Sequence, residues 1–149
     1  LCLVILMIKI ENLTKIYKSK KRSKVKALDN INLTLPNSGL VFVLGKSGSG
    51  KSTLLNLIGG LDSITSGNIV VDGNDISNFK EKEFCDYRNT HIGFIFQDFN
   101  LFEDLTVFQN INLVSSLQGK NINKNDIQDY LKKVNDIFQF INLRNPKLW

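Results

Sequence analysis

The stretch that decides how this sequence folds reads Gly45-Lys46-Ser47-Gly48-Ser49-Gly50-Lys51-Ser52. It matches the phosphate-binding pattern GxxxxGK followed by Ser or Thr at every position. An apolar run, Leu40–Leu44, precedes it and is expected to form a strand buried on both faces. The segment that follows, Lys51–Gly60, is rich in Leu and Ile and predicts a buried helix. The motif requires this order of strand, loop and helix, so the context supports the match.

The composition of this loop suits close contact with phosphate oxygens. Gly48 and Gly50 leave room for backbone N–H groups to approach them. The helix that begins near Lys51 adds unpaired N–H groups and a partial positive charge of about half a unit. Lys51 offers a cation to the β- and γ-phosphates, Ser52 offers a hydroxyl to Mg²⁺, and Thr53 can reach the α-phosphate. We therefore predict a site for a nucleoside triphosphate and Mg²⁺, formed by Gly45, Lys46, Ser47, Gly48, Ser49, Gly50, Lys51, Ser52 and Thr53.

The overall composition indicates one soluble domain with a hydrophobic core. The chain has 149 residues, of which 42% are hydrophobic and 22% charged, so it can bury apolar surface and does not resemble a disordered chain. Two Cys far apart and a single His argue against a zinc site or a disulfide framework. No stretch approaches the roughly 20 apolar residues needed to cross a bilayer. We interpret residues 1–6 as a non-native leader ahead of Met7, with a signal peptide as the alternative.

The positive charge of the chain is local. The formal net charge is +5, but Lys15–Lys26 alone holds seven basic residues and no acidic one. The rest of the chain carries 12 basic and 14 acidic residues, so nucleic acid is not an expected partner. We expect this basic segment to be a solvated loop between the first two strands. Contact with anionic lipid headgroups and weak electrostatic help to nucleotide approach remain as alternatives.

The remaining pattern predicts an α/β chain. Apolar alternation and turn signals predict strands at Met7–Glu11, Ala27–Leu35, Asn68–Val71, Asn74–Ile76 and Ile92–Phe96. Helical spacing and charge predict helices at Lys80–Thr90, Thr106–Leu117 and Ile127–Ile141.

A guanine-nucleotide site is one interpretation of Asn123-Lys124-Asn125-Asp126, which matches the NKxD pattern. Its context does not fit, since the polar residues Gln118-Gly119-Lys120 stand where an apolar strand should end. No Asp in the chain stands three residues before a Gly, as the accompanying DxxG pattern requires. A polar loop that caps the last helix is the better interpretation.

Several further segments resemble the nucleotide-binding subunit of ATP-binding-cassette (ABC) transporters, most closely the lipoprotein and macrolide exporter subfamily. They are Glu11-Asn12-Leu13-Thr14-Lys15-Ile16-Tyr17, the loop with Ser52-Thr53-Leu54-Leu55-Asn56, Gly60-Leu61-Asp62, Ser66-Gly67, and Ile92-Gly93-Phe94-Ile95-Phe96-Gln97-Asp98-Phe99-Asn100-Leu101. The resemblance implies a partial ABC ATP-binding domain at residues 7–149. Its fold would be the N-terminal part of a P-loop NTPase: a RecA-like core with an antiparallel β edge at about 7–98 and the start of a helical subdomain at about 99–149.

The resemblance also implies roles outside the loop. Tyr17 looks like the aromatic that stacks on adenine, with a half-buried tyrosine at a strand end as the alternative. Gln97 looks like the glutamine that reaches Mg²⁺ and the attacking water, which makes Ser52 and Gln97 the implied metal contacts. Phe99–Val107 would line the groove that receives a cytoplasmic helix of the membrane permease, with plain core as the alternative.

The family's remaining motifs do not occur in this sequence. It has no LSGGQ-type signature, no apolar strand ending in Asp-Glu and no switch histidine, because His91 precedes Gln97. Hydrolysis needs carboxylates to orient water and hold the Mg²⁺ shell, so Lys51 and Gln97 can assist but no catalytic set is complete. We expect a truncated chain that does not hydrolyse ATP alone, with an unpaired apolar edge at Leu40–Leu44.

The favoured function is that of an ATP-binding subunit that energises an ABC transporter. In its full-length form it would lie at the cytoplasmic side of the cell membrane, paired with a second ATP-binding subunit and held there by its permease. A soluble ABC-type ATPase of DNA repair or translation, and a non-catalytic nucleotide-binding fragment, are the alternatives.

Overall fold

The computed structural model describes residues 7–18, 24–37, 39, 41–96, 101–120, 122–123 and 125–133. The chain divides into two compact units, Leu1–Phe94 and Ile95–Trp149, which are described one at a time. The first unit carries the predicted phosphate-binding loop.

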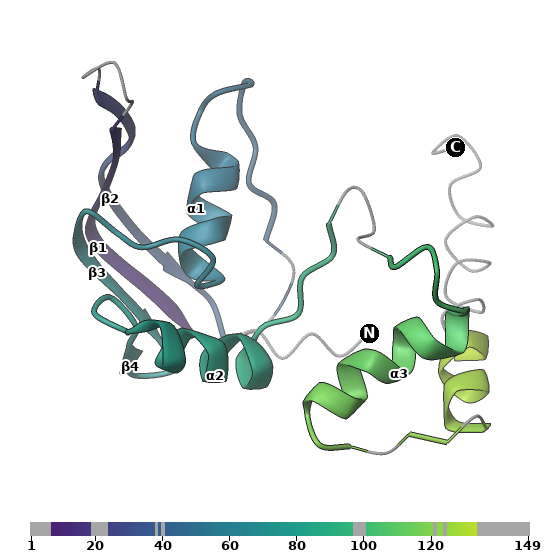
Figure 1. Ribbon diagram of the computed structural model, residues 1–149. Coiled ribbons are helices and arrows are strands. Elements are labelled where there is room, and N and C mark those ends of the chain that lie inside the picture. The colour runs from purple at the N-terminus through teal and green to yellow at the C-terminus, as the bar shows by residue number, and fades with distance from the viewer. Residues whose placement is uncertain are drawn as a thin grey trace. The chain divides into compact units, whose positions relative to one another are not determined.

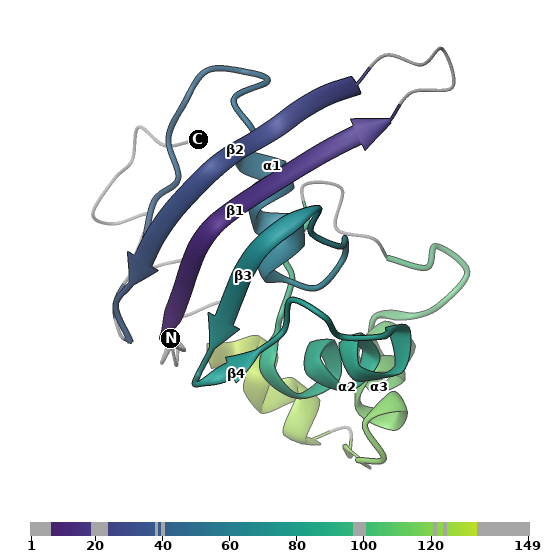
Figure 2. The same ribbon diagram turned by 90° about the vertical axis from the view of Figure 1, so that its left-hand side faces the viewer.

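An antiparallel sheet forms the base of the first unit. Its strands lie in the order β2-β1-β3-β4, as Figure 2 shows. Their bounds are Ile8–Lys18 for β1, Lys24–Leu35 for β2, Ser66–Val71 for β3 and Asn74–Asp75 for β4. The predicted antiparallel edge is therefore present. Asp72 and Gly73 join β3 to β4 with positive φ angles of 51° and 79°, as a tight hairpin turn requires.

The first hairpin is longer than the sequence predicts. β1 continues beyond Glu11 to Lys18, and Lys18 pairs with Lys24 in β2. Much of the basic segment that we expected to be a solvated loop is therefore strand. Lys15 is even buried, with 7% of its surface exposed.

Helix α1, Lys51–Ile58, packs on one face of this sheet (Figures 1 and 2). Its buried Leu54 and Leu57 join a core of strand residues, one residue just after β4 and one helix residue: Ile10, Leu13, Leu28, Ile69, Val71, Ile76 and Tyr87. Tyr87 comes from α2, Glu81–His91, which lies close to the predicted Lys80–Thr90. The core holds the start of α1, and with it the loop, against the strands.

Two predicted strands are absent from the described residues. Neither residues 41–46 nor residues 92–96 form a strand. The side chains of Phe42 and Leu44 are 74% and 87% exposed, so the burial on both faces that was expected for Leu40–Leu44 is wrong. Ile95, in the other segment, is 94% exposed. A strand is stabilised by a hydrogen-bonded neighbour, and no strand of the described sheet pairs with either segment. Local apolarity alone is therefore not enough to make them strands.

The second unit is helical where it is described. Helix α3, Val107–Leu117, follows Thr106, whose side chain accepts a hydrogen bond from the Gln109 N–H while the Gln109 side chain accepts one from the Thr106 N–H. Residues 125–133 form another helical segment with Ile127 buried. The rest of the predicted Ile127–Ile141 helix lies outside the described residues. None of the described helices is long and apolar enough to cross a membrane.

Candidate functional site

The glycines of the loop hold it in a conformation that other residues rarely adopt. Gly48 and Gly50 have φ angles of 78° and 88°, both left-handed. A Cβ atom on Gly50 would lie 2.6 Å from the backbone oxygen of Ala27 and 2.8 Å from a methyl carbon of Leu28, whereas one on Gly48 would meet open space. Gly50 is therefore required by both its conformation and its close approach to β2.

A cavity of about 280 Å³ lies at the N-terminal end of α1. It is lined by seven consecutive residues of the loop and helix, Ser47–Thr53, and by three residues of β2, Val25, Lys26 and Ala27. The structure thus brings together most of the predicted phosphate-binding residues. Among the described residues that line it none is acidic, and Lys26 and Lys51 supply positive charge, so the cavity favours an anion.

The backbone donors at the start of α1 remain suited to an anion. The first intrahelical hydrogen bond runs from the Leu54 N–H to the Gly50 oxygen, over 2.8 Å. No side chain of the described residues caps this end, and the first turn contains no acidic residue. The N–H groups of Lys51, Ser52 and Thr53 therefore add their dipoles to the charge of the cavity.

The Lys51 side chain forms hydrogen bonds with the beginning of its own loop. Its ammonium donates hydrogen bonds to the backbone oxygens of Gly45 and Lys46, over 2.9 and 2.8 Å. These contacts give Gly45 and Lys46 a role although they do not line the cavity: they hold the cation of Lys51 beside it. With the Lys51 side chain in this position, a cavity lined by Ser47–Thr53 is still present.

Sequence reasoning missed the contribution of β2. Val25, Lys26 and Ala27 line the cavity because the hairpin carries β2 past the loop, a placement that no local motif reports. Lys26 lies in the basic segment, and weak electrostatic help to nucleotide approach, one of the alternatives for that segment, is the one signal in the sequence for this role. Its ammonium lies 3.0 Å from the Asp29 carboxylate.

Tyr17 lies beside the cavity, not in its lining. It pairs with Val25 across the hairpin, and Val25 does line the cavity. The Tyr17 hydroxyl donates a hydrogen bond to Asp62 over 2.8 Å, and the Lys15 ammonium lies 4.9 Å from the centre of the Tyr17 ring. Tyr17 is 40% exposed. A partly exposed, anchored ring suits the predicted stacking role.

Two other predicted sites fall partly or wholly beyond the described residues. Gln97 lies outside them, as do Phe99 and Asn100 of the predicted docking segment. In its described part, Leu101, Phe102 and Val107 are exposed. The Asn110 side chain, which sequence reasoning did not select, holds this loop by hydrogen bonds to backbone atoms of Phe102, Leu105 and Thr106.

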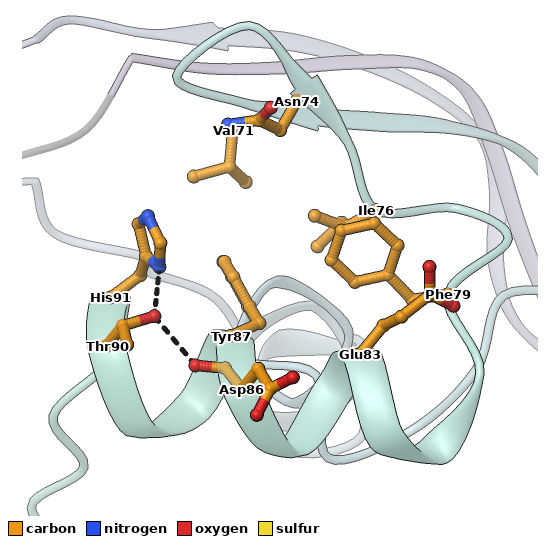
Figure 3. Close-up of a pocket in the computed structure, with 9 residues that line it drawn as sticks. All are labelled: Val71, Asn74, Ile76, Phe79, Glu83, Asp86, Tyr87, Thr90 and His91. Atoms are coloured by element: carbon orange, nitrogen blue, oxygen red, sulfur yellow. Dashed lines mark hydrogen bonds between the residues drawn. The ribbon is translucent and has the colours of Figure 1, made fainter. Parts of the chain in front are cut away.

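A second cavity, of about 270 Å³, lies between the β3–β4 hairpin and α2 (Figure 3). Its lining is largely apolar with two carboxylates, and comprises Val71, Asn74, Ile76, Phe79, Glu83, Asp86, Tyr87, Thr90 and His91. The ring of His91 stacks on that of Tyr87, and burial raises the pKa of Tyr87 to about 12. The acidic groups make this cavity a poor candidate for phosphate.

Comparison with known proteins points to one family. A family model described as "ABC transporter" matches residues 28–146. The ABC transporter ATP-binding protein YtrE of Bacillus subtilis (strain 168) is 41% identical over 119 residues, which cover 78% of this chain and 52% of YtrE. The lipoprotein-releasing system ATP-binding protein LolD of Buchnera aphidicola subsp. Schizaphis graminum (strain Sg) is 42% identical over 125 residues, covering 83% and 54%. The chain thus spans about half the length of these curated relatives.

A solved structure agrees with the sequence relatives. The dimeric post-hydrolysis state of the ATP-binding cassette MJ0796, bound to ADP and Pi, superposes with a TM-score of 0.72 at 36% identity. The match covers 80% of this chain and 52% of that one. The fold is therefore that of a P-loop ATPase cassette, over the part that the chain spans.

Proposed function

The chain belongs to the ABC transporter family, and from that premise we propose that it binds ATP with Mg²⁺ at Gly45–Thr53 as part of a transporter's ATP-binding subunit. The observation that carries the proposal is the cavity at the start of α1, whose described lining comes from the loop, α1 and β2 and includes no acidic residue. It suits a chain of phosphates, because backbone dipoles and two lysines act on the same volume.

The residues fit a triphosphate better than a bare metal ion. Among the described residues there is no cluster of three or more His, Cys, Asp or Glu that could hold a metal. Mg²⁺ commonly keeps several waters and binds through substrate phosphates with few protein ligands. Ser52 would supply its hydroxyl to such an ion, and Gln97 is the second proposed contact. When bound, Mg²⁺ would neutralise charge on the β- and γ-phosphates.

We assign binding, and not turnover, to this chain on its own. Lys51 and the amides of α1 can hold and polarise the phosphates, but none of the described residues that line the cavity has a carboxylate to orient a water. The sequence contains no Asp-Glu strand to supply such a carboxylate, and it also lacks the signature motif and a histidine after Gln97. The catalytic step of the family would therefore need groups beyond this sequence.

The proposed partners are a permease and a second ATP-binding subunit. Support for the permease contact comes from the exposed apolar side chains of Leu101, Phe102 and Val107, since clustered exposed apolar groups mark interaction surfaces. Support for pairing comes from the dimeric cassette that the chain matches. The site of action would be the cytoplasmic face of the membrane, through the permease.

Titration of the chain with ATP and Mg²⁺ in a calorimeter tests the proposal. Lys51→Ala should weaken binding about 10- to 100-fold, since a hydrogen bond to a charged group contributes about 1.5–3 kcal/mol. Lys82→Ala removes an exposed lysine of α2 and serves as the matched control, with unchanged affinity expected. Equal affinity of the unsubstituted chain and Lys51→Ala would contradict the proposed site.

A further inference from the structure

Lys15 is a buried lysine that the phosphate site does not use. It has 7% of its surface exposed and lies in β1. Burying an ammonium is unfavourable unless it is paired and hydrogen-bonded. Its Nζ atom lies 2.6 Å from Oδ1 of Asp62 and also donates a hydrogen bond to the backbone oxygen of Ser63. The ammonium is therefore fixed between β1 and the loop after α1.

The Asp62 carboxylate joins Lys15 to Tyr17. Its second oxygen accepts a hydrogen bond from the Tyr17 hydroxyl over 2.8 Å, and the Ser63 N–H donates to its first over 2.8 Å. Burial alone would raise the pKa of Asp62, but hydrogen bonds from Lys15, Tyr17 and Ser63 outweigh it and hold that pKa below 3.8. The carboxylate is thus a charged acceptor at neutral pH.

Two contacts define how the Tyr17 ring is oriented. Asp62 fixes the hydroxyl end, and the Lys15 ammonium lies over the ring, 4.9 Å from its centre. The hydrogen bond at the Tyr17 hydroxyl and the ammonium against the face of the Tyr17 ring together restrict both side-chain torsions of this residue. The ring therefore loses its rotational freedom before any ligand arrives, which lowers the entropy lost on binding.

The fixed ring lies next to the phosphate cavity. Tyr17 and Val25 are directly paired across the hairpin, so their side chains project from the same face of the sheet and their Cβ atoms lie roughly 5 Å apart. Val25 lines the cavity. A nucleotide whose phosphates occupy the loop would therefore have the ring within reach of its base.

We propose that Lys15 and Asp62 are positioning residues that hold Tyr17 ready to stack on the base of the bound nucleotide. The proposal rests on the proposed function, because it takes ATP as the ligand of the cavity. It differs from a role in stability alone: the pair would favour a ligand that carries a base over one that carries only phosphates.

The test compares ATP with inorganic tripolyphosphate, which has the phosphates but no base. In Asp62→Asn the ammonium of Lys15 loses its counter-charge and the Tyr17 hydroxyl loses a charged acceptor. We expect the dissociation constant for ATP to rise about five- to tenfold and that for tripolyphosphate to stay within about twofold. Glu11→Gln, which neutralises an exposed ion-paired carboxylate on the same strand, is the control and should change neither.

A second measurement reports on the ring without any ligand. Fluorotyrosine incorporated at the three tyrosines gives three ¹⁹F resonances, and Tyr17→Phe identifies one of them. Asp62→Asn should shift the Tyr17 resonance and leave those of Tyr87 and Tyr130 in place. An unmoved Tyr17 resonance would overturn the proposal, and so would equal weakening of ATP and tripolyphosphate. An unsubstituted chain that binds neither ligand contradicts the proposed function itself.

Discussion

The ammonium of Lys51 lies 2.9 Å from the backbone oxygen of Gly45. This hydrogen bond joins a residue at the end of the phosphate-binding loop to its first residue. The contact keeps the charge of Lys51 beside the cavity at the start of α1. Together with the close approach of Gly50 to β2, this contact fixes the shape of the loop through interactions within the chain.

The two left-handed glycines should differ in their tolerance of a side chain. Gly48→Ala is expected to lower the free energy of unfolding by about 1–2 kcal/mol, the conformational cost alone. Gly50→Ala adds a clash with the Ala27 backbone and should cost about 1–3 kcal/mol more. Urea unfolding followed by circular dichroism measures both, and equal losses in the two variants would contradict the close approach of Gly50 to β2.

Tyr87 should ionise at a higher pH in the folded chain than in the unfolded chain. Burial raises its pKa to about 12 from an ordinary value of 10.0, so the folded chain retains this proton after the unfolded chain has lost it. The stabilisation is complete below pH 10 and is lost as the pH rises from 10 to about 12. Absorbance titration of the unsubstituted chain and of Tyr87→Phe at alkaline pH should show that the phenol removed by the substitution ionises near pH 12 in the folded chain.

The substitution Tyr87→Phe removes the hydrogen bond of the hydroxyl and keeps the packing of the ring, so it measures the hydrogen bond alone. The hydroxyl donates to the backbone oxygen of Ile58 over 2.8 Å, at the end of α1. Tyr87→Phe should therefore lower the free energy of unfolding by about 1 kcal/mol and abolish the late phenol titration. Tyr130→Phe, at an exposed position, is the control and should change neither quantity.

Acid should weaken the contacts that the Asp62 carboxylate makes with Lys15, Tyr17 and Ser63. The pKa of Asp62 is below its usual 3.8 in the folded chain, so the unfolded chain takes up this proton first. The stabilisation is present above pH 3.8 and is lost as the pH falls through the lower, folded value. In thermal unfolding between pH 5 and pH 2, Asp62→Asn should show a smaller loss of melting temperature than the unsubstituted chain, and parallel curves would contradict the assignment.

The apolar segment before the loop should promote self-association. Phe42 and Leu44 are largely exposed, and residues 41–44 help to line an apolar groove of about 400 Å³ with Ile8 and Leu54. Exposed apolar segments without strand partners favour aggregation. Phe42→Lys should therefore lower light scattering of concentrated samples, whereas Ser116→Lys, which adds the same charge at an exposed site of α3, should not.

Local patterns predicted the loop and α1 well, because the motif and the helix are set by neighbouring residues. The strand expected at Leu40–Leu44 failed for the opposite reason: a strand needs a partner, and the described sheet offers none to this segment. Val25–Ala27 were missed because only the pairing of β1 with β2 carries them to the cavity. The role of Gln97 stays a prediction.

Amide chemical shifts during a titration with ATP and Mg²⁺ test the central claim most directly, because they locate the ligand. We expect the largest changes at Ser47–Thr53 and at Val25–Ala27, and their loss in Lys51→Ala. Changes confined to the cavity between α2 and the β3–β4 hairpin, or no change at the loop, would contradict the account.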